Sequence, residues 1–499
     1  MDIPGRVAPC PQAESAKAPA RIGNARNWDS LGTGVATFTI ESVYRLIFLR
    51  LSSTSTESVL NFTSTLEAVK YWAGQRLLQS ALHPHYLKLT GKDRPLPTYD
   101  HWLAAEALDL ADRKAEGALP SGYRLVLSKG ACLAASGAYW LAQAAEDSGA
   151  DLIYADEDVI GPDGRRGNPI FKPAWSPELF AHCDYLGGAY LIREGVDADD
   201  LKGRKIAHVP RILIHRDAPA EYSLRTFVER TGSELVSVIV CSRNPTLTAE
   251  CFETLRSNTT YARYEIILID HRAGMAAVAE RFGAQRIPYD EEFNFARMCN
   301  TGARASRGEL LLFLNDDTAP LDPAWMSHMA GQAERREVGP VGALLTFPDG
   351  RVQHAGIYIG TSNGAGHPGR LTSGSPPWPW LSMTREQMAV TGACLTLRRE
   401  VFEEVGGFDE SFPVNYNDTD LCLRCGQAGY KAILEARARV EHRESTTRKI
   451  GINYGERRRF LDRWAELIGR GDPYWNANLT DNELLLPDPE AFKRVPRWR

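Results

Sequence analysis

The stretch LLFLNDDTAP, Leu311–Pro320, places two adjacent aspartates directly after an uninterrupted apolar run. Such a run, which begins at Leu310, predicts a strand that is buried on both faces of a parallel sheet. Two neighbouring carboxylates repel each other, so each must be solvated or paired. A divalent cation would remove the repulsion, and Mg²⁺ commonly takes one or two carboxylates together with substrate phosphates. The stretch therefore predicts a central strand that ends in a ligand-binding pair, Asp316 and Asp317.

The second half of the chain alternates short apolar strands with helical patterns. Strands are predicted at LVSVIVCS, YEIILID, QRIPYD and ELLLFLN, with helices at TAECFETLRSNT, AVAERFG and FNFARMCNTGARASRG between them. This alternation is typical of βαβ units and therefore of an α/β fold. Ligands of open α/β sheets lie at the carboxyl ends of the strands. Ser242, Arg243 and Asp270 follow two of these strands, so we expect them to meet the aspartate pair in one crevice. For Asp270 the alternative of a carboxylate that caps the next turn stays open.

Composition excludes several classes of protein. The 499 residues are 43% hydrophobic and 24% charged, which is ordinary for a globular protein of up to about three domains. A net charge of -5 and a pI of about 6.2 do not favour a protein that binds nucleic acid. The odd number of cysteines, nine, and the lack of a secretory signal at the start favour a cytoplasmic location. Residues 36–51 predict an amphipathic helix that either packs on its own domain or contacts a membrane surface peripherally.

Ordered motifs in the second half carry a family resemblance. The segments VSVIVCSRN, EIILIDH, FNFARMCNTGARASRGELLLFLNDD, VQHAGIYIG, VTGACLTLRREVFEEVGGFDE, NYNDTDLCLR and RVEHRESTTR resemble the family 2 glycosyltransferases, over residues 235–450. The likeness is greatest to bacterial enzymes of O-antigen, rhamnan and capsule assembly. The resemblance implies the GT-A fold, a Rossmann-like and mostly parallel sheet flanked by helices. It also implies inverting transfer of a sugar from a nucleotide-sugar donor to an acceptor hydroxyl.

The resemblance further implies roles for individual residues. Asp317 would contact a metal ion, Mg²⁺ or Mn²⁺, that bridges the donor diphosphate, and Asp316 would contact the ribose or sugar. His442, in VEHRES, would ligate the metal or contact the diphosphate, with a buried structural histidine as the alternative. The remaining residues of the donor pocket would be Ser242, Arg243, Asp270, Asn294 and Asn300.

The transfer reaction also needs a general base that takes the proton of the acceptor hydroxyl. The family pattern implies that this base is Asp418, in NYNDTDLCLR. We interpret Asp420, two residues further, as a helix N-terminal carboxylate that the macrodipole favours. Trp378 and Trp380 lie in a long Gly/Pro/Ser-rich stretch, where they could stack on acceptor sugars or pack the loop onto the core.

The first half contains an incomplete resemblance to the same family. The segment DLIYADEDVIGPDGRRGNPIFKPAWSPELF resembles the middle of the first catalytic domain in tandem two-domain members. The nucleotide-binding half has no room before it, and the aspartate motif is replaced by LVLSKGACLAASG. Lys129 and Cys132 there cannot hold a divalent metal as two carboxylates would. We interpret the acidic residues Asp156, Glu157 and Asp158 as a strand-end turn without chemistry.

These observations predict four parts: a tail and helical region (1–115), a degenerate glycosyltransferase-like module (116–220), a catalytic domain (234–470) and a C-terminal tail (471–499). APAEYSLRTFVERTGS predicts a helix that links the two modules. The expected function is metal-dependent sugar transfer to a glycan or lipid-linked acceptor in surface polysaccharide assembly. The alternative is a non-catalytic scaffold that binds a nucleotide-sugar or a glycan, which would not need the base. A sugar nucleotidyltransferase would show a Gly-rich basic loop after the first strand, and CSRNPTLT is not one.

Overall fold

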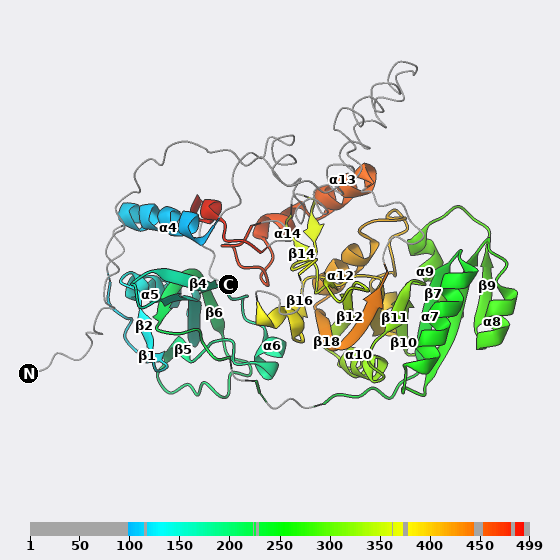
Figure 1. Ribbon diagram of the computed structural model, residues 1–499, viewed down its shortest axis with the longest axis horizontal. Coiled ribbons are helices and arrows are strands. Elements are labelled where there is room, and N and C mark those ends of the chain that lie inside the picture. The colour runs from blue at the N-terminus through cyan, green and yellow to red at the C-terminus, as the bar shows by residue number, and fades with distance from the viewer. Residues whose placement is uncertain are drawn as a thin grey trace, which may run out of the picture. The chain divides into compact units, whose positions relative to one another are not determined.

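The computed structural model describes residues 98–113, 117–222, 224–225, 229–361, 363–372, 378–443, 453–480 and 485–493 (Figure 1). All of these residues belong to one compact unit, which contains two large β-sheets flanked by helices. The amphipathic helix predicted over 36–51 lies outside the described residues. None of the helices in the described stretches is long and apolar enough to cross a membrane.

The larger sheet begins with the predicted alternation of strands and helices. Its elements are β7 (Val236–Ser242), α7 (Pro245–Ser257), β8 (Tyr264–His271), α8 (Ala276–Phe282), β9 (Gln285–Tyr289), α9 (Phe295–Ala305) and β10 (Leu310–Leu314). The strands lie side by side in the order β10-β7-β8-β9, and every neighbouring pair is parallel. The α/β fold predicted from the sequence is therefore confirmed, with the strand LLLFL near the middle of a ten-stranded sheet.

Beyond β10 the same sheet continues with mixed pairing. The elements after β10 are β11 (Thr318–Pro320), α10 (Trp325–Ala333), β12 (Val338–Thr346), β13 (Val352–His354), β14 (Tyr358–Ile359), β15 (Ala365–Gly366), η1 (Pro379–Ser382), β16 (Arg385–Gln387), β17 (Cys394–Arg398), α11 (Arg399–Glu404), α12 (Asn417–Gln427), β18 (Lys431–His442), α13 (Tyr454–Arg463), α14 (Ala465–Arg470) and η2 (Pro489–Lys493). Of these strands, β14 and β15 form a separate two-stranded sheet. The order here is β11-β18-β12-β17-β10, with β13 beside β12 and β16 beside β18. Only β12 and β18 are parallel in this half, so the expected mostly parallel sheet is parallel around β7 and mixed elsewhere.

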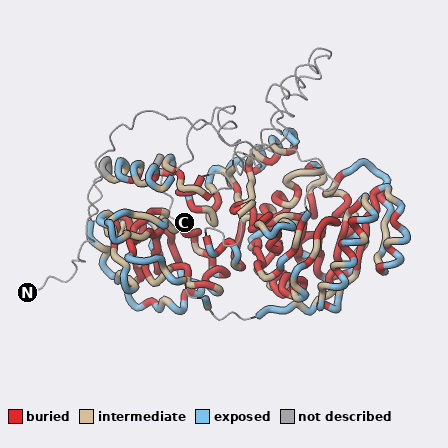
Figure 2. Tube along the Cα trace, in the orientation of Figure 1, coloured by how far each residue is buried: buried red, intermediate tan, exposed pale blue. Residues whose placement is uncertain are grey.

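The strands of this sheet are largely buried (Figure 2), and helices pack on both faces, which explains the uninterrupted apolar runs. Leu310, Leu312 and Leu314 belong to the core shared with α7, α8 and α10. Leu311 and Phe313 pack on the other face, with α9, α11 and α12. Full burial of each such side chain stabilises the fold by about 1.5–3 kcal/mol. The carboxyl end of β10 is therefore held firmly at the point where the aspartate pair follows.

The smaller sheet repeats the second half of the larger one. Its elements, with the helix that precedes them, are α4 (Tyr99–Arg113), β1 (Tyr123–Leu127), β2 (Ala131–Leu133), α5 (Gly137–Ser148), β3 (Leu152–Ile160), β4 (Arg166–Ile170), α6 (Pro177–His182), β5 (Ala189–Arg193) and β6 (Ile206–Arg216). The order β1-β5-β3-β6-β2, with β4 beside β3, matches β10-β17-β12-β18-β11, with β13 beside β12. The strand directions match pair by pair. Counterparts of β7, β8 and β9 are absent from the described part of this module, which supports its interpretation as degenerate.

Two predictions in this region are wrong. The helix predicted at APAEYSLRTFVERTGS does not form, because no described residue of 218–233 is helical, and Leu224 instead forms an isolated β-bridge with Cys183. The acidic residues of DLIYADED do not occupy a turn after the strand. Asp156, Glu157 and Asp158 all lie inside β3 and are buried. Their partners come from distant segments, which a local pattern could not reveal.

The tryptophans considered for acceptor stacking pack between the two modules instead. Trp378 and Trp380 are both buried, and their rings stack with centroids 5.8 Å apart. The ring of Trp378 contacts Phe171, and that of Trp380 contacts Tyr222, both from the first module. The packing interpretation of these two residues is therefore the correct one.

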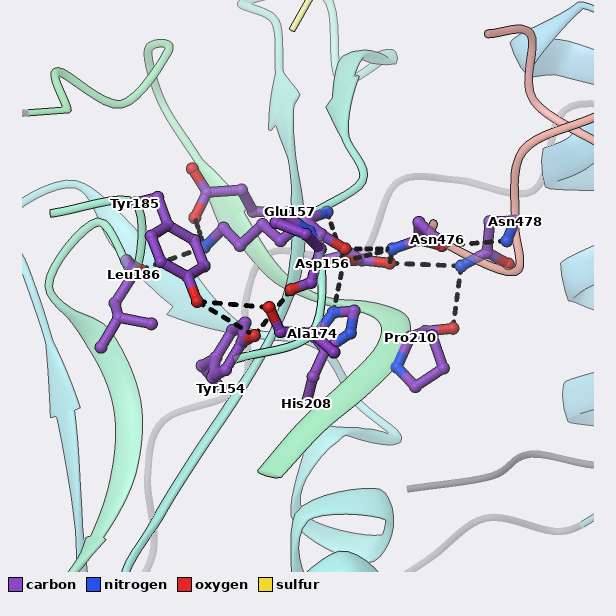
Figure 3. Close-up of polar contacts among 12 residues, drawn as sticks. Tyr154, Asp156, Glu157, Ala174, Tyr185, Leu186, His208, Pro210, Asn476 and Asn478 are labelled. Atoms are coloured by element: carbon purple, nitrogen blue, oxygen red, sulfur yellow. Dashed lines mark hydrogen bonds and ion pairs between the residues drawn. The ribbon is translucent and has the colours of Figure 1, made fainter. Parts of the chain in front are cut away.

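Asp156 is the centre of a buried polar network in the first module (Figure 3). Its carboxylate accepts hydrogen bonds from the Lys172 backbone nitrogen at 2.9 Å and from His208 Nε2 at 2.8 Å. The side-chain amides of Asn476 and Asn478 also donate to it, at 2.8 and 3.2 Å. All four side chains of this network are buried. The described residues 472–480, which fall in the predicted C-terminal tail, are thus fixed to the first sheet.

We expect Asp156→Ala to lower the free energy of unfolding by at least about 3 kcal/mol, because it leaves several buried donors without an acceptor. Denaturant unfolding measures this change. Asp163→Ala is the matched control, since Asp163 lies in the exposed turn between β3 and β4 and pairs with exposed Arg165. The control should lose less than about 1 kcal/mol. Similar losses in both variants would contradict the structural role of Asp156.

Candidate active site

Ser242 and Asp316 meet at the carboxyl ends of the adjacent strands β7 and β10. The Ser242 hydroxyl donates a hydrogen bond to Asp316 Oδ2 and accepts one from the Thr248 hydroxyl at 2.8 Å. Ser242, Asp316 and Asp317 are all buried, whereas Arg243, the next residue after β7, is exposed. Because the two strands are parallel neighbours, their ends form one edge of the sheet. The serine therefore holds Asp316 in a fixed direction at this edge.

A second contact brings His442 to Asp317 from far along the chain. Strand β18 pairs with β11, and His442 lies opposite Thr318 in that register. This pairing places His442 Nε2 3.1 Å from Asp317 Oδ1, with both side chains buried. Asn315 Nδ2 lies 3.3 Å from the same ring nitrogen. The structure thus brings together the two residues that the family resemblance implied as metal contacts.

The aspartate pair is electrostatically strained. Burial raises the pKa of Asp316 to about 6, against the opposing hydrogen bond from Ser242 and with the added charge of Asp317. Two adjacent buried carboxylates cannot both ionise without cost, and a nearby cation relieves that cost. Such a perturbed pair at the ligand-binding edge of a sheet is a candidate functional site.

The side chains at this edge fit a hard divalent cation. Asp317 offers a carboxylate oxygen and His442 an imidazole nitrogen, while Asp316 is held by Ser242. Among the described residues, no cluster of three or more His, Cys, Asp or Glu side chains could hold a metal ion. A cation would therefore complete its coordination with diphosphate oxygens and water. That sharing of ligands between protein and substrate is usual for Mg²⁺.

Asp270 is already engaged by protein groups. Its carboxylate accepts hydrogen bonds from the backbone nitrogens of Ala273 at 3.0 Å and Met275 at 2.7 Å, and from Arg286 Nε at 2.6 Å. Burial alone would raise the pKa of Asp270, but these hydrogen bonds and the Arg286 charge hold it below its ordinary value. These contacts match the turn-capping alternative, and contact with a nucleoside stays a prediction.

The next residue, His271, is a candidate that the sequence did not reveal. Its ring lies near Tyr289 and Phe293, with ring centroids 5.8 and 5.7 Å away. The residue is buried, and neither ring nitrogen has a hydrogen-bond partner among the described residues. An unpaired buried polar group costs about 1–3 kcal/mol, and a group that hydrogen-bonds to the ring would remove that cost. No motif signals this role, because only burial distinguishes His271 from an ordinary surface histidine.

Asn294 and Asn300 hold the helix α9 in place. Asn294 caps the first turn of α9 and donates from Nδ2 to the backbone oxygen of Glu410 at 2.8 Å. Asn300 donates to the backbone oxygen of Phe408 and accepts from its backbone nitrogen, each at 2.9 Å. Both side-chain amides are therefore used within the protein. Their predicted contact with the donor stays a prediction.

Asp418 lies in the first turn of α12 and is linked to the aspartate pair through backbone contacts. Its Oδ2 accepts hydrogen bonds from the Gly392 backbone nitrogen at 2.8 Å and from the Thr391 hydroxyl at 3.3 Å. The adjacent Ala393 oxygen accepts a hydrogen bond from the backbone nitrogen of Asn315 at 3.0 Å. A short connected path therefore joins Asp418 to the end of β10.

Asp420, in the same helical turn, has a structural role. It is fully buried and pairs with Arg424 Nε and Arg463 Nη1, each at 2.8 Å, and it accepts from Trp464 Nε1 at 3.1 Å. These contacts join α12 to the end of α13. They support the interpretation of Asp420 as a residue that stabilises the helix rather than one that reacts.

Residues 237–406 match the family model described as Glycosyl transferase family 2. The chain carries a family 2 glycosyltransferase domain. The matched range includes β7, β8 and β10 with the aspartate pair, and it ends before Asp418 and His442.

The chain is similar in sequence to curated proteins named for O-antigen biosynthesis and rhamnosyl transfer. Over 407 residues the chain is 32% identical to the O-antigen biosynthesis protein RfbC of Myxococcus xanthus, covering 66% of this chain and 31% of that protein. Over 116 residues it is 30% identical to the N-acetylglucosaminyl-diphospho-decaprenol L-rhamnosyltransferase of Mycobacterium tuberculosis, covering 21% and 38%. The chain spans less than half the length of these curated relatives. The solved mannosyltransferase PcManGT from Pyrobaculum calidifontis, in complex with GDP-Man and Mn²⁺, gives 16% identity and a TM-score of 0.34, covering 44% of this chain and 59% of that one.

The first module lacks the aspartate pair of the glycosyltransferase domain. Residues 128–130, Ser-Lys-Gly, connect β1 to β2, whereas residues 315–317, Asn-Asp-Asp, connect β10 to β11. Lys129 lies in this connection as predicted. Cys132 does not replace an aspartate, because it lies within β2.

A guanidinium group in the first module occupies the place that His442 has in the glycosyltransferase domain. Arg216 is paired with the first residue of β2, as His442 is paired with the first residue of β11. The guanidinium binds Glu157 at 2.9 Å and donates to the Ser128 hydroxyl at 2.8 Å. A fixed positive charge therefore lies where a metal ion would be needed, and Glu157 balances it.

We expect Asp420→Asn in the glycosyltransferase domain to lower the free energy of unfolding by at least about 2 kcal/mol, because two arginines lose their carboxylate. Asp418→Asn should lose less than about 1 kcal/mol, because Asp418 is only half-buried and hydrogen-bonds to neutral groups. Denaturant unfolding of both variants distinguishes the two roles. Equal losses would show that the two aspartates do not differ as described.

Proposed function

We propose that the chain is an inverting, metal-dependent glycosyltransferase. The proposed reaction moves a sugar from a nucleotide-sugar donor to a hydroxyl of a glycan or lipid-linked glycan acceptor in surface polysaccharide assembly. The observation that carries this proposal is the close approach of Asp317 and His442 at the edge to which Asp418 is also linked. The relatives named for O-antigen biosynthesis and rhamnosyl transfer support the polysaccharide setting.

The donor would lie along the carboxyl ends of β10, β7 and β8. Asp317 and His442 are the residues that would hold Mg²⁺ or Mn²⁺ with the donor diphosphate, and Asp316 would face the ribose or sugar. When bound, the ion supplies Lewis-acid stabilisation of the negative charge on the leaving diphosphate. Neighbouring strands lie about 4.8 Å apart, so β8 is roughly 10 Å from β10, which leaves room for a nucleoside that extends toward His271.

Asp418 is the proposed general base. The Gly392 and Thr391 contacts hold Oδ2, and Thr419 donates to Oδ1 from its backbone nitrogen at 2.7 Å and its hydroxyl at 3.2 Å. The acceptor hydroxyl would replace one of the two threonine hydroxyls as a donor to the carboxylate. As the acceptor oxygen bonds to the anomeric carbon, its proton passes to Asp418 and the bond to the diphosphate breaks. The electron pair of that bond leaves with the diphosphate. Attack on the face opposite the leaving group inverts the configuration of the sugar.

We expect release of nucleoside diphosphate from a nucleotide-sugar to require Mg²⁺ or Mn²⁺ and to stop when EDTA is added. Asp317→Ala should lower the rate by at least about 100-fold, because the variant loses a charged contact to the group that stabilises the leaving diphosphate. A panel of nucleotide-sugars, with and without glycan acceptors, gives the measurement.

Asp349→Ala is the matched control for this experiment. Asp349 also lies in the glycosyltransferase domain, but in an exposed turn where it pairs with Arg351. The control should keep its activity. Metal-independent turnover, or full activity in Asp317→Ala, would contradict the proposed mechanism.

Asp418→Asn separates the enzyme from the scaffold alternative. We expect the variant to bind the nucleotide-sugar as tightly as the wild type and to lose transfer by about 10²- to 10⁴-fold, since only the proton acceptor is removed. Calorimetric donor binding and product formation are measured on the same preparation. Wild-type protein that binds donor and glycan but forms no product with any donor would favour a scaffold.

A further inference from the structure

His354 is a buried histidine whose two ring nitrogens are both engaged. It ends β13 and has no exposed surface. Its Nδ1 lies 2.9 Å from Nδ1 of His367, and its Nε2 lies 3.4 Å from the backbone nitrogen of Thr391. The rings of the two histidines meet edge to face with centroids 5.1 Å apart. The pair therefore lies directly beside the segment that holds Asp418.

The backbone contact decides where the protons of this pair are. An amide N–H can only donate, so Nε2 of His354 accepts and the ring proton is on Nδ1. That proton is donated to Nδ1 of His367. A second proton on either ring would break one of the two hydrogen bonds, because two N–H groups would then face each other. Burial holds the pKa of His354 well below its usual value, in agreement with a neutral His354 ring.

Thr391 and Gly392 transmit this arrangement to Asp418. The backbone nitrogen of Thr391 is bound by His354, while its hydroxyl and the Gly392 nitrogen both bind Asp418 Oδ2. The fit is close, since a Cβ atom at Gly392 would lie 3.2 Å from Cβ of Asp418. A shift of this segment would therefore move the carboxylate.

We propose that His354 is a positioning residue for Asp418, acting through Thr391 and Gly392, and that His367 keeps His354 in the accepting tautomer. The inference rests on the proposed role of Asp418 as the base. A misplacement of about 1 Å at a reacting group can cost about 100-fold in rate. An oriented, buried contact of this kind keeps the base in place before the acceptor arrives.

A double-mutant cycle tests this inference. His354→Leu removes both hydrogen bonds at similar side-chain volume, and we expect kcat to fall about 10- to 100-fold while the donor Kd is unchanged. His354→Gln offers a carbonyl acceptor and an amide donor, so it should restore part of the rate. In an Asp418→Asn background, His354→Leu should lower the residual transfer by less than about 2-fold, because the carboxylate it positions is already gone.

The matched control is His328→Gln, at another buried histidine, on α10, which should leave kcat unchanged in both backgrounds. An equal fractional loss from His354→Leu in both backgrounds would overturn the inference and assign His354 to general packing. If His354→Leu does not fold, His367→Leu, at a half-buried position, applies the same cycle with the same criterion. Absence of transfer by the wild type, or wild-type transfer by Asp418→Asn, would instead refute the proposed function.

Discussion

The approach of His442 to Asp317 is the contact on which the candidate site depends. It exists because β18 pairs with β11 directly after the aspartate pair. Strand β18 is held in turn by β12 and β16, and β10 is held between β7 and β17. His442 thus ends one strand and Asp317 directly precedes another, and the rest of the sheet keeps these strands in register. A site built this way needs the whole sheet, since no local segment contains both groups.

The smaller sheet shows a different solution at the equivalent point. It keeps the strand order and the pairing that place a side chain of β6 where β18 places His442, but that side chain is Arg216. The connection between β1 and β2, Ser-Lys-Gly, contains no carboxylate, and Glu157 from β3 is the anion that pairs with Arg216. An internal ion pair, Arg216 with Glu157, therefore lies where the other sheet brings His442 close to Asp317. The two sheets share their strand order, while the side chains at this point differ.

Much of the fold could be predicted from the sequence because buried parallel strands have a local signature. The runs LVSVIVCS, EIILID and ELLLFLN became strands, and the polar residues at their ends met at one edge. The failures share one physical cause, which is that burial depends on partners far along the chain. The Asp156 carboxylate accepts hydrogen bonds from the side chains of Asn476 and Asn478, so a residue that we interpreted as part of a turn can lie inside a buried strand. The tryptophans of the long loop are likewise buried by aromatic rings of the other module.

The difference between what a local sequence pattern indicates and what distant partners determine also applies inside the candidate site. Some of the residues that the motif resemblance selects, such as Asp270 and Asn300, already form hydrogen bonds with backbone groups of turns and loops. They shape the crevice whether or not they touch the donor. His271 has the opposite character, since its position is buried and its ring nitrogens have no partner among the described residues. Any group that hydrogen-bonds to this ring would remove the cost of leaving its nitrogens unpaired. Among the described residues, buried polar atoms without a partner also occur elsewhere, for example at Trp378 and Trp475, so it is the position of His271 at the end of β8 that makes it a candidate.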